Sequence, residues 1–525
     1  MKGQPNPLGR SPLPSGADIV FLALLYLLIG VRANSLFDDA STGWHLVSGQ
    51  YIIAHLHLPR YDLISYTFPT RPWVPFEWLF DAVAAALVQI GGLPLLAVVA
   101  GSAIALLFFL LFQDARRAGC PFLTALALTL IGALASSVHW LARPHLFTFF
   151  GVYVFARLLE AFHLRHLSGP AVTLLLGVTM LVWSNAHPGF VIGFAMIVIY
   201  LVSEAVSAAV VSGPGGSEAR RRAKVLLAAL TIVVAASFVN PNGLALYPSF
   251  GSALQQLGRN VMTQEFQSPT FHGELYSVSL ELLFASFILG LATSRRRPWL
   301  GQSLLVLAFA FLALNGVRNV PLFVIVSIPV IADLLADSNL LALVGATGGA
   351  HAGWVEAWVR GWQRIERGYN QMEWRCTMHL APIAAVALLA LSCVSAGRIP
   401  GVRPLVSSSF DPRHVPTTTL AYIRDHDLAW DRGLSLDNWG GYIRYETGER
   451  IFIDDRTTFY PWEFYQRYVQ MMFAQPGWRK RLDDYRFEWV LVPKNSPLAA
   501  ALRERPTWQI SAEDAAAYLF LRKSP

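Results

Sequence analysis

Long apolar runs recur along most of this 525-residue chain, and they constrain its fold more than any other feature. A bilayer core about 30 Å thick needs around twenty apolar residues for each crossing helix. Only 14% of the residues are charged, against about 25% in soluble domains, which excludes a soluble enzyme, a disordered chain and a collagen-like fibre. We therefore expect a polytopic α-helical membrane protein with about 11 transmembrane helices. The predicted spans are residues 17–34, 93–113, 121–138, 145–163, 171–186, 189–211, 223–239, 277–293, 299–314, 320–336 and 379–396.

Basic residues between these spans predict their orientation, because short cytoplasmic loops carry an excess of Lys and Arg. The clusters are Arg116–Arg117, Arg157 with Arg165, Arg220–Arg222 and Arg295–Arg297. With a cytoplasmic N-terminus, the bias is met only if the apolar stretch 77–91 lies along or dips into the outer face without crossing. The stretch 337–378 is predicted to be an amphipathic helix on the inner surface. We expect a multi-pass protein of the cell inner (plasma) membrane, whose net charge of +7 reflects this topology and not nucleic-acid binding.

The chain changes character after residue 396. Residues 397–415 are rich in Pro, Ser and Arg, as in a linker. In residues 416–525 short apolar runs alternate with turns and helical stretches, which predicts a small extracytoplasmic α/β domain. Its expected strands are Gly433–Leu436, Arg450–Ile453, Phe487–Val492 and Ala517–Leu521, and its expected helices are 416–425, 461–474 and 496–504. Residues 1–396 would then be the transmembrane domain, with a large first outer loop at 35–92.

The loops predicted to lie outside hold acids, histidines and two arginines. These residues are Asp38, Asp39, His45, Glu77, Arg143, His145, His187 and Arg318. Each alone has a structural explanation as a helix cap, a turn residue or a side chain that reaches the lipid head groups. Together, on one face of a membrane where polar groups are costly, they suit an anionic lipid head group. The planar guanidinium of Arg can form two parallel hydrogen bonds to a phosphate, and a carboxylate can take a proton from an incoming hydroxyl.

Several short motifs follow the same order along the chain. They are the acidic pair Asp38-Asp39 after the first helix, Gly43-Trp44-His45, Glu77-Trp78-Leu79, Trp183-x-Asn185-x-His187 and the turn Asn240-Pro-x-Gly243. With the outer domain after the last helix, this pattern resembles the GT-C superfamily of polytopic glycosyltransferases. That superfamily includes dolichyl-phosphate-mannose–protein mannosyltransferases and aminoarabinose transferases, and it uses polyprenyl-phosphate-linked sugars outside the membrane.

The resemblance implies roles for the outer residues. In such enzymes an acidic residue of the first outer loop is the catalytic base or helps to hold a divalent metal. Asp38 and Asp39 match it, and the choice between them as the base stays open. Asp39 and Glu77 would be the ligands of an Mg²⁺ or Mn²⁺ ion. Charge and predicted side assign Arg143 and Arg318 to the lipid phosphate with His187 assisting, and Glu77, His45 and His145 are the other candidate substrate-binding residues.

We therefore expect a glycosyltransferase that moves a hexose or pentose from a polyprenyl-phosphate donor to a glycan, lipid or protein acceptor. The transfer would take place at the outer face of the membrane, where membrane lipids surround the protein. The alternative is a lipid or sugar transporter or flippase of the cell envelope, which would favour inverted repeats and charges near mid-span. In the tail, Asp437–Tyr442 and Ile453–Arg456 combine aromatic, carboxyl and amide groups that suit sugar binding. The structural alternative for the first is a strand–turn–strand with its bend at Gly440-Gly441.

Overall fold

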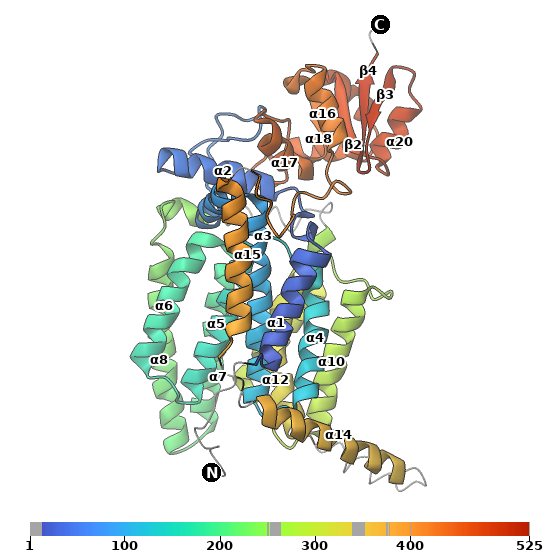
Figure 1. Ribbon diagram of the computed structural model, residues 1–525. Helices are drawn as coiled ribbons and strands as arrows, with labels where there is room; N and C mark the ends of the chain where they lie inside the picture. The colour runs from blue at the N-terminus through green and yellow to red at the C-terminus, as the bar shows by residue number, and fades with distance from the viewer. Residues whose placement is uncertain are drawn as a thin grey trace.

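In the computed structural model, which describes residues 13–248, 251, 264–338, 352–373, 376, 378–399 and 401–523, a bundle of apolar helices carries a smaller region with a β-sheet at one end (Figure 1). We call the end of the bundle that carries the C-terminal region, residues 401–523, the site end, because the predicted site residues lie there. The helices of the bundle are α1 (Gly16–Tyr26, continued by a π-helical turn at Leu27–Val31), α3 (Trp78–Arg117), α4 (Phe122–Ser136), α5 (His145–His163), α6 (Gly169–Ala186), α7 (Val191–Val210), α8 (Pro214–Ser237), α10 (Leu275–Thr293), α11 (Leu300–Asn315), α12 (Val320–Ala336) and α15 (Leu380–Arg398).

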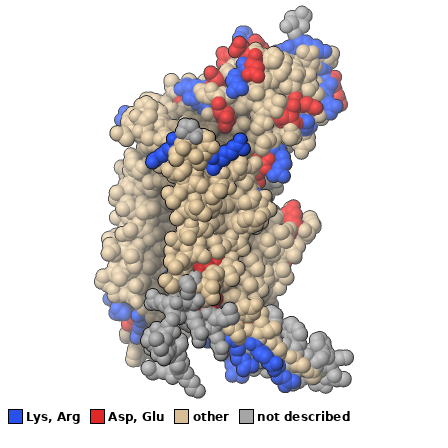
Figure 2. All heavy atoms as spheres, in the orientation of Figure 1, with Lys and Arg blue, Asp and Glu red and all other residues tan. Residues whose placement is uncertain are grey.

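Each predicted span coincides with one of these helices. Within the described residues, 8 helical segments are long and apolar enough to cross a membrane, and two shorter apolar ones are Gly16–Val31 and Leu300–Asn315. Figure 2 shows the bundle covered mainly by uncharged side chains, with charges gathered on the C-terminal region and at the opposite end. The polytopic helical class is therefore confirmed. The number of crossings, about 11, and the compartment on each side remain predictions.

The stretch 77–91, predicted not to cross, forms the first segment of α3. The helix is interrupted at Gly91 and Gly92, and the φ of 71° at Gly92 is a left-handed value that favours glycine. Helix α2 (Thr42–His55) packs along this first segment, and a Cβ on Gly49 would overlap the backbone of Asp81. The packing places Glu77, the residue before α3, at the site end.

At the opposite end lies α14 (Ala352–Glu373), which covers part of the predicted inner stretch 337–378 (Figure 1). The Glu366 carboxylate accepts a hydrogen bond from the Leu123 amide (2.8 Å), and the Glu373 carboxylate accepts one from the Gly16 amide (2.7 Å). These bonds cap the first turns of α4 and α1. Residues 339–351 of the predicted stretch lie outside the described residues.

The C-terminal region contains a 4-stranded sheet in the order β1-β2-β4-β3. Its strands are β1 (Gly433–Ser435), β2 (Trp489–Pro493), β3 (Trp508–Glu513) and β4 (Ala517–Arg522), and its helices are α16 (Thr418–Asp425), α17 (Asp437–Thr447), α18 (Trp462–Met472), α19 (Trp478–Asp484) and α20 (Pro497–Arg503). Strands β1 and β2 are parallel, and the other pairs are antiparallel. The predicted α/β character is therefore confirmed, although β3 was not predicted.

Two tail predictions were wrong. Arg450–Ile453 is not a strand of the sheet, because Ile451 pairs with the first outer loop instead: the Tyr66 amide donates to the Ile451 carbonyl (2.9 Å), and the Ile451 amide donates to the Ile64 carbonyl (3.1 Å). Asp437–Tyr442 is not a strand–turn–strand but the start of α17, which ends at Gly448 with a φ of 76°. Its glycines serve close packing and not a bend.

The contact between α17 and α2 joins the C-terminal region to the first outer loop. A Cβ on Gly43 would overlap the backbone of Gly441, and a Cβ on Gly441 would lie 2.8 Å from the Trp44 amide nitrogen. Both distances are shorter than real Cβ contacts allow, so backbone must approach backbone here. This glycine contact fixes how the C-terminal region sits on the bundle.

We expect Gly43→Ala to lower the midpoint of thermal unfolding in detergent, because overpacking a tight contact costs about 1–3 kcal/mol. Gly361→Ala in α14 is the matched control, since a Cβ there meets no atom within 4 Å. The control should keep the wild-type midpoint. Equal midpoints for the two variants would show that the α2–α17 contact tolerates a methyl group.

Candidate functional site

Asp39 lies where the first outer loop leaves the bundle, between the short helix η2 (Ser35–Phe37) and α2. Its carboxylate accepts hydrogen bonds from the Ser41 amide (2.9 Å) and from the Asn438 side chain of α17 (3.1 Å). The Arg143 guanidinium lies 2.5 Å from its other oxygen. Burial raises the pKa of Asp39, but the charge of Arg143 and these hydrogen bonds bring it below the ordinary value. Asp39 is therefore ionised at neutral pH.

Arg143 is the central cation of the site. It follows the turn after α4, which is held to η2 by a hydrogen bond from the Ala142 amide to the Leu36 carbonyl (2.9 Å). Burial alone would lower the pKa of Arg143, but the surrounding carboxyl groups raise it, so the guanidinium stays charged. Its Nε is buried and receives no hydrogen-bond partner from the described residues. The carboxyl groups around it belong to Asp39, Glu265, Asp455 and Glu77.

Glu77 lies between two histidines at the start of α3. Its carboxyl oxygens are 3.7 Å from His187 Nε2 and 3.9 Å from His45 Nδ1. Its side chain is 18% exposed, and burial raises its pKa to about 7 despite the nearby charges of Arg143 and Arg318. Glu77 therefore changes its protonation state near neutral pH.

The Trp-x-Asn-x-His motif orients His187. Trp183 donates to the Thr148 hydroxyl (2.9 Å), and this hydroxyl lies 2.7 Å from His187 Nδ1, which also accepts from the Gly189 amide (3.0 Å). With Nδ1 occupied as an acceptor, Nε2 carries the ring proton and faces Glu77. Burial lowers the pKa of His187 well below its ordinary value, so the ring is neutral. Asn185 accepts a hydrogen bond from Trp78 (2.9 Å), which ties the motif to α3.

Arg318 and Glu265 form a second ion pair on the other side of Arg143. Arg318 NH1 lies 3.5 Å from Glu265 Oε1, and the guanidinium lies 4.5 Å from the centre of the Phe266 ring. His139 Nδ1 is 3.7 Å from Glu265 Oε2. The ring of His145 packs on that of His139, with centroids 4.1 Å apart. His145 thus contacts the site through the ring of His139. Glu265 is a member of the site that we did not predict.

Asp38 faces a different direction from Asp39. Its carboxylate lies 3.2 Å from His414 Nδ1 and is 30% exposed. Among the described residues, Asp38, Asp411 and His414 form a group whose possible metal-ligand atoms lie within 4.8 Å of one another. Arg413 already binds both oxygens of Asp411, at 3.0 and 2.5 Å, so a cation would have to displace it. This donor set is therefore a poor fit for a tightly held ion.

The predicted metal ligands Asp39 and Glu77 lie in separate surroundings, one against Arg143 and Asn438, the other between histidines. Both oxygens of Asp39 already have partners. Their role as metal ligands therefore remains a prediction.

Two cavities adjoin the site. A polar one of about 430 Å³ is lined by Arg32, Asp38, Asp39 and Asn438 together with Ser137 and Trp140. An apolar one of about 590 Å³ lies between the start of α3 and the ends of α6 and α8, lined by Trp78, Leu181, Val182, Asn185, Phe238 and Val239. The first reaches Asp39, and the second reaches the residues next to Glu77 and near His187. The ionic site therefore has a polar cavity at Asp39 and an apolar cavity close to Glu77.

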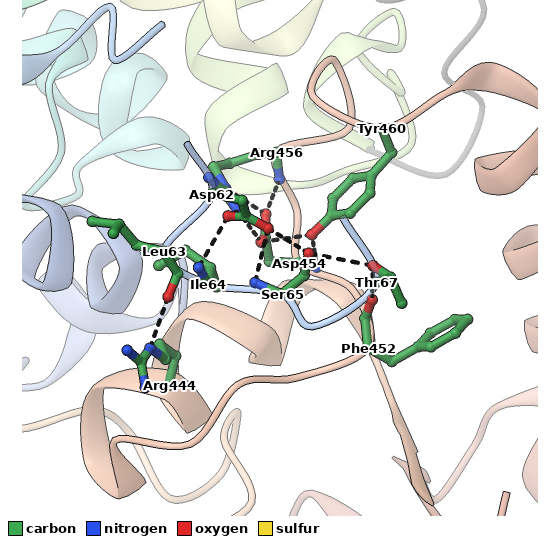
Figure 3. A network of polar contacts seen from close by, with 10 residues as sticks. All are labelled: Asp62, Leu63, Ile64, Ser65, Thr67, Arg444, Phe452, Asp454, Arg456 and Tyr460. Atoms are coloured by element: carbon green, nitrogen blue, oxygen red, sulfur yellow. Dashed lines mark hydrogen bonds and ion pairs between the residues drawn. The ribbon is translucent and has the colours of Figure 1, made fainter. Parts of the chain in front are cut away.

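A network of buried polar contacts locks the first outer loop to the C-terminal region (Figure 3). The Arg456 guanidinium donates to Asp62 (2.6 Å) and to both oxygens of Asp454 (2.9 and 2.6 Å). Tyr460 donates to Asp454 (2.8 Å), and Asp62 also accepts from the Ser65 amide (3.0 Å). Burial raises the pKa of Asp62, but Arg456 and the hydrogen bonds lower it overall. The carboxyl groups of Asp62 and Asp454, bonded to the same guanidinium, hold the two segments together.

The structure brings together five of the residues predicted for the site: Asp39, Glu77, Arg143, His187 and Arg318. His45 contacts Glu77 and Asp81 but is 0% exposed. Asp38 lines the polar cavity together with Asp39, but its carboxylate lies against His414. Glu265 was not in the predicted set, and Asn438 and Asp455 were included only as parts of the tail segments Asp437–Tyr442 and Ile453–Arg456. Glu265 could have been found because it is an acidic residue in a loop predicted to lie outside. Asp455 could have been found because it belongs to the run Asp454-Asp455-Arg456 in an aromatic segment.

The raised pKa of Glu77 predicts how stability changes with pH. Between about pH 4.5 and about pH 7 the folded protein keeps a proton on Glu77 that the unfolded chain releases, so this group makes the fold less stable as pH rises through that window. Glu77→Gln should therefore lose less stability than the wild type between about pH 5 and about pH 8, measured by thermal unfolding. The exposed Glu449→Gln is the control and should follow the wild type. If the unfolding midpoint of Glu77→Gln fell with pH as steeply as that of the wild type, the raised pKa of Glu77 would be contradicted.

No family model matches the sequence, and no curated protein does. Solved structures do match. The apo oligosaccharyltransferase of Archaeoglobus fulgidus is 12% identical, with a TM-score of 0.55 over 91% of this chain and 68% of that one. The A. fulgidus oligosaccharyltransferase AglB, in complex with an inhibitory peptide and a dolichol-phosphate, is 12% identical, with a TM-score of 0.54 over 91% and 69%.

ArnT from Cupriavidus metallidurans in the apo state is also similar, at 14% identity and a TM-score of 0.45 over 96% of this chain and 97% of that one. Identities this low establish a shared fold and not a shared activity. The resemblance noted in the sequence is confirmed at the level of the fold: this chain has a fold similar to that of the A. fulgidus oligosaccharyltransferase.

Proposed function

We propose that this protein is a glycosyltransferase that moves one sugar from a polyprenyl-phosphate donor to an acceptor on the outer face of the membrane. The observation that carries the proposal is the ion pair of Asp39 and Arg143, with a polar cavity at Asp39 and an apolar cavity near Glu77. A lipid-linked sugar needs apolar space for its chain, a cation for its phosphate and polar space for an acceptor. A lipid or sugar flippase remains the alternative, and it would leave the donor chemically intact.

The donor would bind with its phosphate at Arg143 and its chain in the apolar cavity. A guanidinium binds phosphate through charge-assisted hydrogen bonds, and the Nε of Arg143 is unoccupied by the described residues. Arg318 adds a second positive charge, and the neutral His187 can donate from Nε2. The dolichol-phosphate in the AglB complex, a protein of the same fold, supports a donor of this class.

In the reaction, an acceptor hydroxyl or amide in the polar cavity attacks the anomeric carbon with inversion. The bond from the anomeric carbon to the phosphate oxygen breaks, and the phosphate keeps the electron pair. Asp39 takes the proton of the acceptor. Arg143 and Arg318 stabilise the charge that develops on the leaving phosphate.

Donor binding would also prepare Asp39 as the base. Arg143 and hydrogen bonds hold the pKa of Asp39 low in the free protein, so its carboxylate has little affinity for a proton. When a phosphate takes up part of the Arg143 guanidinium, Asp39 loses part of that stabilisation and its pKa rises. The base would therefore gain strength only when the donor is in place.

Asp39→Asn should lower turnover of an undecaprenyl-phosphate-linked sugar by about 10²–10⁴-fold, the usual contribution of a general base, without loss of folding. Asp38→Asn should lower it by less than about tenfold, because Asp38 faces His414. Donor consumption by purified protein in detergent, supplied with native membranes as the source of acceptor, measures both. Full activity of Asp39→Asn would reject this residue as the base, and an intact donor with the wild type would favour the flippase.

Arg143→Lys should weaken binding of undecaprenyl phosphate by at least about tenfold, because lysine keeps the charge but not the planar fork. The charge balance of the buried carboxylates is retained, so the variant should fold. Binding can be followed by quenching of tryptophan fluorescence. Arg424→Lys in α16 is the exposed control and should bind as the wild type does. Equal affinity for the two variants would remove Arg143 from the phosphate site.

A further inference from the structure

Asp455 is the one charged residue of the run Asp454-Asp455-Arg456 that takes no part in the lock of Figure 3. Asp454 and Arg456 bind each other, and Arg456 also binds Asp62. No described residue donates a hydrogen bond to the buried Oδ1 of Asp455. The charges that act most strongly on its carboxyl group are those of Asp39 and Arg143. The lock thus leaves one carboxyl group of the C-terminal region close enough to the proposed base for their charges to interact.

This arrangement is unfavourable for the folded protein alone. A buried acceptor without a donor loses the hydrogen bonds that water would give it, and the negative charge of Asp39 repels a second carboxylate. Both effects raise the pKa of Asp455 well above its ordinary value. In native structures a buried polar atom without a partner calls for an explanation, such as a bound ligand, water or ion.

The surroundings indicate which ligand group fits. Arg143 already balances the charge of Asp39, and the Asn438 amide bonds to the same carboxylate. A neutral group that donates a hydrogen bond therefore suits Asp455 better than an anion. The polar cavity that reaches Asp39 and Asn438 is where the acceptor is proposed to enter, whereas the apolar cavity lies near Glu77. An acceptor hydroxyl meets both requirements.

We propose that Asp455 binds a hydroxyl group of a sugar acceptor beside Asp39, and that Arg456 is its positioning residue. The acceptor is thus inferred to be a glycan or glycolipid, and the inference rests on the proposed function. Arg456 acts through its bonds to Asp454 and Asp62 and through packing on Trp73, whose ring centre lies 4.6 Å from the guanidinium. The C-terminal region therefore completes the site that the helices begin.

The test compares transfer with hydrolysis, in which water replaces the acceptor. An undecaprenyl-phosphate-linked sugar is the donor, and native membranes supply the acceptor. Asp455→Asn should raise the amount of membrane needed for half-maximal transfer by at least about tenfold, and it should lower transfer more than it lowers the slow hydrolysis. Arg456→Lys should shift transfer in the same direction. Asp425→Asn, exposed in α16, is the control and should match the wild type.

The outcomes are distinguishable. A wild-type protein that neither transfers nor hydrolyses the donor overturns the proposed function and this inference with it. With an active wild type, unchanged membrane dependence in Asp455→Asn overturns the inference alone, as does an equal loss of hydrolysis and transfer. A new requirement for added Mg²⁺ or Mn²⁺ in Asp455→Asn would mean that this residue holds a cation and not a hydroxyl. If Arg456→Lys lowers the unfolding midpoint but leaves transfer unchanged, its role is structural only.

Discussion

The charge of Arg143 is the interaction on which the rest of the site depends. This half-buried guanidinium lies among the carboxyl groups of Asp39, Glu265, Asp455 and Glu77, which come from four separate parts of the chain. Without this positive charge the carboxylates would repel one another in a place with little water. Their protonated, neutral forms would then be favoured. Because removing one partner of such a group leaves the others uncompensated, the loops that supply them are held in one arrangement. Arg143 itself depends on the turn that the Leu36–Ala142 hydrogen bond fixes to η2.

Close backbone packing and a buried ionic lock make the C-terminal region part of this site. Gly43 and Gly441 allow α2 and α17 to touch, which brings Asn438 to Asp39. Arg456 joins Asp62 of the outer loop to Asp454, and it leaves Asp455 on the side of Arg143. The two contacts lie on different elements, so the C-terminal region is fixed against rotation as well as separation. A reaction centre formed at such a junction would lose its acceptor side if either contact loosened.

Hydrophobic periodicity and charge bias were sufficient to predict the helices and the gathering of polar loops at one end, because both depend on composition over many residues. They could not choose between Asp38 and Asp39, which are adjacent in sequence but face His414 and Arg143 respectively. The helix α17 was missed because Gly440 and Gly441 look like a bend, and only their contacts with Ile453 and Trp44 explain them. Glu265 and Asp455 could not be chosen either, since their importance lies in distant partners that no local pattern contains.

In the proposed mechanism, the positive charge of Arg143 changes partners. In the free protein its bond to Asp39 keeps that carboxylate ionised and weakly basic. A phosphate at the same guanidinium would compete for it, and each step of that exchange would raise the proton affinity of Asp39. Donor binding and base strength are then coupled through one side chain. In this mechanism the acceptor that enters the cavity at Asp39 supplies the proton that Asp39 takes, so efficient transfer needs both substrates.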